Sequence, residues 1–323
     1  MKPAFSIIVN GKDDITTLIA DRLVSLEISD HAGVKSDRMT LTIDDRDQLI
    51  EFPETGVKIE VSLGYVGGAL TKMGKYVVDE VDVVGPLRHM TIRANAADMT
   101  GGIKSPKERS WPGITFGNLV RTIATDNGLT PAIASDLSAR ELGHIDQTES
   151  DMQLLQRICT EQGATCKVAD GRLVVAARAA GKTTAGGDMP KAAISSGDCD
   201  SWSAVISKRN AYKAVKAYWQ NVRLANRTGV IAGSGAPMLT LKHSYANAAD
   251  AKQAADSKLK ALKRGAGKLR ITGLIGDPAM SAEMQATLTG FRQGIDGGDW
   301  VINEVTHSLS DDGYTCSLEL ESK

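Results

Sequence analysis

Aromatic residues are scarce in this sequence, since Phe, Trp and Tyr together make up 4% of its 323 residues. Its cores must therefore be built from aliphatic side chains, and a hydrophobic content of 42% is sufficient for packed cores. A strong net charge is also absent, because the formal charge at pH 7 is −1. This balance argues against a protein that binds nucleic acid or a membrane surface through its overall charge.

Long apolar runs are missing as well. No segment approaches the ~18 consecutive apolar residues that cross a membrane as a helix. The apolar run within the N-terminal sequence MKPAFSIIVNG is too short for a signal peptide. We therefore expect a soluble protein that is made in the cytoplasm and has no membrane anchor.

Cysteine and histidine do not form a recognisable metal or nucleophile motif. No two cysteines have the CxxC spacing, and no histidine lies beside a cysteine at a spacing typical of metal ligands. We expect buried, reduced thiols, because a free cysteine behaves as a small apolar residue. The residues concerned are Cys159, Cys166, Cys199, Cys316, His31, His89, His144, His243 and His307.

One short motif imitates a phosphate-binding loop. Gly181-Lys182-Thr183 follows a predicted strand, but a phosphate loop needs a glycine five residues earlier, where this chain has Ala176. A helix should also follow so that its N-terminus faces the phosphate. The residues after Thr183 are small and rich in glycine, and they predict a polar linker instead.

Three acidic residues lie close together at Asp146, Glu149 and Asp151. A carboxylate pair for acid–base catalysis is one interpretation. Caps and a solvated helix start explain them better, because acidic groups are favourable at helix N-termini. The sequence thus predicts no catalytic, cofactor-binding or metal-binding residue, and we do not expect an enzyme.

A basic run near the end of a predicted helix has no acidic residue within it. It lacks the aromatic partners of a single-strand binder, although contact with DNA phosphates stays an alternative. A solvated helix face or an interface with an acidic neighbour is the preferred interpretation. A second basic segment, Lys104–Arg109, is expected to be an exposed loop that contacts a partner. The run comprises Lys258, Lys260, Lys263, Arg264, Lys268 and Arg270.

The first 96 residues show the alternation of apolar and polar residues that is typical of strands packed on a core from one side. Met39, Leu41 and Ile43 are one example, and Asn10-Gly11 is a strong hairpin signal. Loops are expected at residues 30–37 and 51–56. Several such strands predict a small, barrel-like β domain.

A connector rich in glycine, proline and basic residues is expected at Ala97–Gly113. Thr115 is predicted to cap a helix with an apolar stripe, which Gly128 and then Pro131 end. The connector and this helix form the first half of a small α/β insert, which is predicted to span residues 97–180.

The second half of this insert carries the clearest local signals. Ser150 and Gln153 have the capping-box spacing, and Gly163 ends the helix that they begin. Asp170-Gly171 is a two-residue turn between two short strands and predicts a hairpin.

After a linker at 181–200, strands resume and one long Ala/Lys-rich helix runs from Asn247 to about Arg264, stopped by Gly265. We predict an α+β, mainly β fold with two barrel-like β domains, 1–96 and 201–323, and the α/β insert 97–180 between them. The later strands are expected at Ala211–Trp219, Met238–His243, Leu269–Ile275, Met284–Leu288, Trp300–Leu309 and Gly313–Leu320.

Four stretches carry a resemblance that spans most of the chain. Ile145–Ala177 has an acidic-Ser-Asp start, a helix ending in RICTEQG, and a strand-Asp-Gly-strand hairpin. The others are Gly85–Met99, running into KSPKERSW, then Thr115–Gly128, and Gly297–Glu321. Together they resemble the phage late control D family, which comprises the baseplate hub proteins of contractile, P2-like phage tails and tailocins. That family is similar to the base of type VI secretion spike proteins.

The resemblance implies a structural protein of the virion tail baseplate, or of a tail-like particle, that is synthesised in the bacterial host cytoplasm. It implies a homotrimer whose ring joins the sixfold tail tube to the threefold spike. Expected partners are the spike protein, the tail tube or a tube-initiator protein, other baseplate proteins, and the tape measure or DNA passing through the lumen. The chain lacks the β-helix repeats of secretion spikes, so a separate spike chain is expected.

Two alternatives to the hub stay open at this point. A cell-wall hydrolase carried at the tail tip is the enzymatic alternative, which the scattered histidines and the undefined carboxylate pair argue against. The base of a type VI-like secretion spike is the other. No helix-turn-helix or other DNA-reading motif is present in the sequence, so a role in gene control is discounted.

Overall fold

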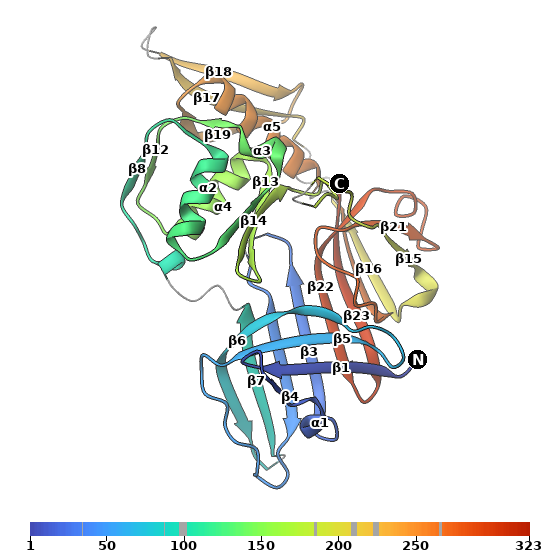
Figure 1. The fold of residues 1–323 in the computed structure, drawn as a ribbon. Coiled ribbons are helices and arrows are strands. Elements are labelled where there is room, and N and C mark those ends of the chain that lie inside the picture. The colour runs from blue at the N-terminus through green and yellow to red at the C-terminus, as the bar shows by residue number, and fades with distance from the viewer. Residues whose placement is uncertain are drawn as a thin grey trace.

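The computed structural model describes residues 1–33, 35–86, 88–96, 102–183, 186–207, 212–221, 226–264 and 267–323. A large sheet forms one half of the molecule, and a compact insert and a second, smaller sheet form the other half (Figure 1). The predictions made for Ala97–Gly101, Ala211 and Gly265 concern residues outside the described ranges.

The N-terminal strands alternate as predicted. In β4, Met39, Leu41 and Ile43 are buried, whereas the two threonines between them are half-buried. Asn10 and Gly11 both have positive φ angles, as the tight turn after β1 requires. The elements are β1 (Pro3–Val9), β2 (Asp13–Asp14), α1 (Thr16–Ile19), β3 (Leu23–His31), β4 (Arg38–Asp44), β5 (Lys58–Tyr65), β6 (Thr71–Val84) and β7 (His89–Ala96).

The C-terminal strands continue the same sheet. β22 pairs antiparallel with β3, from Glu304 opposite His31 to Ser310 opposite Ser25. The strand order is β16-β20-β23-β22-β3-β4-β7-β6-β5-β1-β2; in addition, β21 pairs with β22, and β15 pairs with β21. The C-terminal strands of this sheet are β15 (Ala192–Ser195), β16 (Ser201–Ile206), β20 (Gly267–Ile275), β21 (Gln285–Thr289), β22 (Trp300–Ser310) and β23 (Gly313–Ser322).

One hydrophobic core serves both ends of the chain. Ile28 and Met39 from the N-terminal strands belong to the same buried cluster as Ile271, Val305 and Leu318. The predicted α+β, mainly β class is confirmed. The order of the described strands is an open path, however, and no closed barrel is found among them.

The insert has a core of its own beneath two helices. Thr115 caps α2 by accepting a hydrogen bond from the Asn118 backbone, and Ser150 and Gln153 form the predicted capping box of α4. The insert contains β8 (Arg109–Trp111), β9 (Ile114–Thr115), α2 (Phe116–Asp126), β10 (Thr130–Ile133), α3 (Ser135–Ser138), β11 (Glu141–Leu142), β12 (Ile145–Gln147), α4 (Asp151–Gln162), β13 (Ala164–Ala169) and β14 (Arg172–Ala177).

The hairpin of the insert has the predicted turn. Asp170 and Gly171 have φ angles of 51° and 73°, the left-handed pair that a two-residue hairpin loop needs. Gly163 ends α4 in the left-handed conformation, with φ 67°. These local signals are confirmed.

Two loop predictions are wrong in part. Residues 109–111 of the expected connector form β8, where Trp111 is buried against the insert. Ala192–Ser195 of the expected linker forms β15, which pairs in parallel with β21 and buries Ile194 in the large core. Both strands are too short for an apolar period, and long-range pairing decides their conformation.

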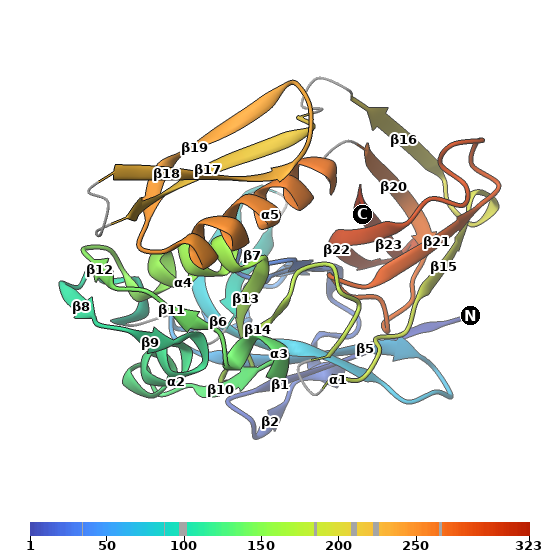
Figure 2. The same ribbon diagram turned by 90° about the horizontal axis from the view of Figure 1, so that it is seen from above.

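A second sheet stands apart from the large one. It consists of β17 (Ala214–Asn221), β18 (Asn226–Gly233), which was not predicted, and β19 (Met238–Tyr245). The long helix α5 (Ala248–Arg264) packs on this sheet and also touches α4 of the insert (Figure 2). The unit predicted at 201–323 thus contains strands of two sheets, and the domain boundaries stay a prediction.

Candidate assembly surfaces and a polar cleft

Lys167 joins the insert to the large sheet. It lies on β13, and its ammonium contacts Asp30 of β3 and, at 2.8 Å, the carboxylate of Asp37. It also donates to the His31 carbonyl at 3.3 Å. Burial raises the pKa of Asp37 to about 6, although Lys167 opposes the shift. Burial lowers the pKa of Lys167, but the two carboxylates outweigh burial and raise it.

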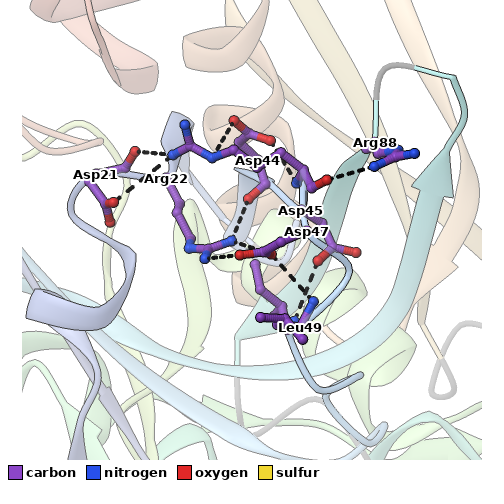
Figure 3. A network of polar contacts seen from close by, with 9 residues as sticks. Asp21, Arg22, Asp44, Asp45, Asp47, Leu49 and Arg88 are labelled. Carbon is purple, nitrogen blue, oxygen red and sulfur yellow. Dashed lines mark hydrogen bonds and ion pairs between the residues drawn. The ribbon is translucent and has the colours of Figure 1, made fainter.

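A network of exposed ion pairs holds the loop after β4 (Figure 3). Arg22 donates two hydrogen bonds to the Asp47 carboxylate, at 2.8 and 2.5 Å, which lower the pKa of Asp47. Arg46 pairs with Asp44 at 3.3 Å, and Arg88 donates to the Arg46 carbonyl at 2.8 Å. Asp44 and Asp47 are each paired with an arginine, so these contacts order the loop.

Two residues that lie opposite each other on paired strands resemble a catalytic cysteine and its histidine base. His307 of β22 lies opposite Cys316 of β23, with 3.3 Å between Nδ1 and Sγ, and Tyr314 lies 2.8 Å from the same nitrogen. Both His307 and Cys316 are fully buried, and burial raises the pKa of Cys316 to about 11. A buried, protonated thiol is not a nucleophile. Sequence spacing did not reveal this pair, because only sheet register brings it together.

The cysteines are free thiols. Cys159, Cys166 and Cys316 are buried as expected, and Cys199 is half-buried. No group of three or more His, Cys, Asp or Glu side chains within the described residues has the arrangement of a metal site.

The segment Gly181–Thr183, whose sequence resembles part of a phosphate-binding loop, forms a different structure. The backbone N–H of Thr183 donates a hydrogen bond to the Gly187 carbonyl at 2.8 Å, and Lys182 and Asp188 form an isolated antiparallel β-bridge. Residues 181–183 and 186–190 contain no helix that could face a phosphate.

The three predicted carboxylates do not converge. Asp146 is exposed and pairs with His144 at 3.0 Å, and Glu149 pairs with Arg157 at 2.7 Å. Asp151 points elsewhere, into the insert. A pair suited to acid–base catalysis is therefore not formed by these residues.

Asp151 is buried, so the prediction of a solvated helix start is wrong for this residue. It is 0% exposed, and its carboxylate accepts hydrogen bonds from Asn127 and Gln147, each at 2.9 Å, and from the Lys107 ammonium. Burial raises its pKa, but these three donors outweigh burial and hold the pKa below its usual value. Lys107 is thus engaged in an ion pair inside the insert. The prediction of an exposed basic loop at Lys104–Arg109 is therefore wrong for this residue.

A polar cleft of about 600 Å³ lies between the insert and the second sheet. Burial raises the pKa of Glu161 to about 7 and raises that of Asp250, and it lowers the pKa of His243. The buried Ser244 hydroxyl, which also lines the cleft, has no hydrogen-bond partner in the described part of the chain. The sequence analysis did not connect these residues, because they come from α4, β19 and α5.

Comparisons with known proteins decide what kind of protein carries these features. A family model described as phage tail baseplate hub (GPD) matches residues 40–313. The probable baseplate hub protein of Escherichia phage 186 is 33% identical over 365 residues, which cover 100% of this chain and 94% of that protein. This chain belongs to the phage tail baseplate hub family. The resemblance carried by the four sequence stretches is thereby confirmed.

Solved structures share the fold of this hub. The tail protein from Neisseria meningitidis MC58 has a TM-score of 0.73 at 16% identity, covering 99% of this chain and 97% of that one. A component of the type VI secretion system of E. coli has a TM-score of 0.55 at 12% identity, covering 94% and 74%. The hub is thus a structural component of the tail baseplate whose fold extends to secretion machinery.

The hub offers an open, apolar sheet edge at β16. This strand pairs only with β20 among the described strands. Val205 and Ile206 are 63% and 64% exposed, and Trp202 is 38% exposed. An exposed apolar edge strand is a template for pairing with another chain unless it is covered. It is therefore a candidate assembly surface.

The basic run of the hub divides between two places. Lys258, Lys260 and Lys263 are exposed on α5, and Arg264 is half-buried at its end. The other two members, on β20, lie in the large sheet. Only the helical members Lys260, Lys263 and Arg264 line a groove with basic residues from other elements.

No helix in the described ranges is both long enough and apolar enough to cross a membrane.

Proposed function

We propose that this hub acts by assembly: three copies form a closed ring that joins the sixfold tail tube to the threefold spike. A head-to-tail contact that closes after a few copies gives a ring instead of a filament. Its partners are then the spike protein, the tail tube or a tube-initiator protein, and other baseplate proteins. The tape measure or DNA passes through the lumen of the ring.

The observation that carries this proposal is the open edge of β16. The exposed Val205 and Ile206 side chains are unfavourable in water, and the unpaired backbone groups of the edge are a template on which another strand can pair. Pairing with a strand of the next copy satisfies the backbone hydrogen bonds and buries these side chains. The opposite end of the sheet, β2, is short and acidic, which is typical of a protected edge.

The mass of the chain in solution tests the ring. Three copies of 34.3 kDa make about 103 kDa, and we expect light scattering to give this mass at low and high salt, because the proposed contact is apolar. The double variant Val205→Lys/Ile206→Lys is expected to give a single copy, since two charges on the edge block strand pairing.

The control variant is Leu49→Lys/Val66→Lys, which places two lysines at aliphatic positions that are 79% and 65% exposed and belong to loops outside β16. It is expected to keep the trimer. A single-copy mass for the wild-type chain at both salt concentrations contradicts ring closure by the hub alone. Equal dissociation of both double variants assigns the contact to another surface.

We also propose that the hub has no catalytic activity of its own, and the polar cleft is the place where the hydrolase alternative is tested. A carboxyl with a pKa near 7 can donate a proton at neutral pH, as Glu161 can. Glycoside hydrolysis needs a second, ionised carboxylate that is available across the scissile bond. The other carboxylates that line the cleft are engaged within the chain, since Glu149 pairs with Arg157, Asp146 pairs with His144 and Asp250 accepts a hydrogen bond from Asn247. We expect no cleared band for the hub on a peptidoglycan zymogram. A band that the wild type gives and Glu161→Gln loses establishes the hydrolase.

The base of a type VI-like secretion spike is the second alternative. The fold is shared with such a component, but the hub relatives match along the whole chain at higher identity. Co-purification with the spike protein of the same tail supports the hub, and assembly into a spike without that protein supports the alternative.

A further inference from the structure

A groove of about 490 Å³ lies where α5 ends, beside the end of α4 and the segment after β14. Six basic side chains and one acidic side chain, Asp136, line it. The basic residues come from the insert, from the segment that follows β14, from α5 and from the last residue of the sequence. They are Arg140, Arg178, Lys260, Lys263, Arg264 and Lys323.

Only part of this positive charge is balanced inside the hub. Arg178 pairs with Glu321 at 3.1 Å, and Arg140 pairs weakly with Asp136 at 3.9 Å. Lys260, Lys263 and Arg264 make no ion pair within the described residues. Burial, followed by the proximity of Arg178, lowers the pKa of Arg264. Glu321 and Glu283 oppose part of this lowering at Arg264, so the positive charge that no ion pair balances is chiefly that of Lys260 and Lys263.

The helix dipole explains part of this arrangement but not all of it. Lys263 and Arg264 lie in the last turn of α5, where cations are favourable beside the unpaired carbonyls. Arg140 donates to the carbonyl of Gln162, the last residue of α4, at 2.8 Å, and Arg178 lies just after β14 and outside any helix. Their convergence with Lys260 on one concavity indicates a site for an external anion.

The shape and lining of the groove favour a peptide over a nucleic acid. No aromatic side chain lines it, and single strands are held by stacking of bases on aromatic rings. The remaining wall includes Ala177, Ala179 and Ala180, whose small side chains leave room for a peptide backbone. Carboxylates suit the guanidinium of Arg264 because they accept two parallel hydrogen bonds.

We propose that this cationic groove binds an acidic peptide segment, one with at least two Asp or Glu side chains, presented by a partner protein. The inference goes beyond the proposed ring, because it specifies the chemistry of a partner. Its test does not depend on ring formation, since peptide binding is measured on the full chain in whatever oligomeric state it adopts.

The experiment is fluorescence anisotropy of the full chain with a labelled peptide of eight glutamates. The matched probes are a peptide of eight glutamines and a single-stranded DNA of eight nucleotides. We expect saturable binding of the glutamate peptide that weakens as salt rises, and weaker binding of both other probes. Lys260→Ala/Lys263→Ala is expected to weaken glutamate binding by about tenfold or more, because two charge-assisted contacts are lost.

The chain supplies a matched control. Lys258→Ala/Lys268→Ala removes the same charge from the same basic run at exposed residues that do not line the groove, and it is expected to leave the affinity within about twofold of the wild type. Lys260→Arg/Lys263→Arg keeps the charge and is expected to keep binding, which separates loss of contact from loss of fold. Equal loss in both alanine pairs, tighter binding of the DNA, or no saturable binding of the glutamate peptide overturns the proposal.

Discussion

Replacing Lys167 with methionine is expected to lower the free energy of unfolding by about 3 kcal/mol at pH 8, because two half-buried carboxylates lose their shared cation. Asp30 and Asp37, which both lie on the large-sheet side of the joint, are then left without the cation that the insert supplies. Methionine keeps most of the side-chain volume, so the loss reports charge more than packing. Urea denaturation measures the change.

The Lys167 effect is expected to depend on pH. Asp37 titrates near 4 when unfolded and near 6 when folded, so its own contribution to stability falls as pH rises through that window. Lysine opposes this shift, and its removal makes the loss greater at pH 8 than at pH 5. Lys58→Met, at an exposed position on β5, is the control and is expected to change stability by no more than about 0.5 kcal/mol. A Lys167 variant as stable as this control shows that the ion cluster does not hold the joint.

Asp151→Asn is expected to cost about 3 kcal/mol at pH 7, because it leaves the Lys107 ammonium without its partner inside the insert. The amide also cannot accept all of the hydrogen bonds that Asn127 and Gln147 donate to the carboxylate. Thermal and urea unfolding of the full chain measure the loss.

The loss in this second variant is also smaller in acid, but here folding lowers the pKa of the carboxyl concerned, whereas it raises that of Asp37. The folded-state pKa of Asp151 is held below its usual value, so the wild-type advantage is present above pH ~4 and is lost as pH falls through the folded pKa. The difference between wild type and variant should therefore narrow in acid. Asp146→Asn is the control, because that carboxylate is exposed and its pair with His144 is worth about 0–1 kcal/mol. A constant difference from pH 7 to pH 3 would falsify the assignment of the loss to the ionised carboxylate.

The local elements followed from short stretches of sequence. Ser150 and Gln153 specify a capping box, and Asp170-Gly171 specifies a two-residue turn, because the atoms that interact lie within a few residues of one another. The resemblance to hub proteins was also available from the sequence, since the stretches that carry it are contiguous.

The polar cleft and the cationic groove could not be predicted from local sequence patterns. Glu161 lies near Asp250 and His243 only because α5 packs on α4. Arg178 lies near Arg264 only because the tertiary structure brings together two segments that are far apart in the sequence. Lys260, Lys263 and Arg264 were recognised as part of a basic run, but the other three basic residues of the groove were not. Exposure and neighbours, which set the pKa values and the unpaired charge, are properties of the packed molecule.

The sequence by itself determined the mainly β class, the helices with their caps, the hairpin of the insert and the family, because each is encoded in local spacing or in contiguous motifs. The tertiary structure alone decided that β22 pairs with β3, so that the two ends of the chain share one open sheet and one core. It also decided that Ala192–Ser195 is a strand and that β16 is left at an edge. Such pairings depend on contacts between residues tens to hundreds of positions apart. The alternation within a strand shows which face is buried but not which strand lies beside it.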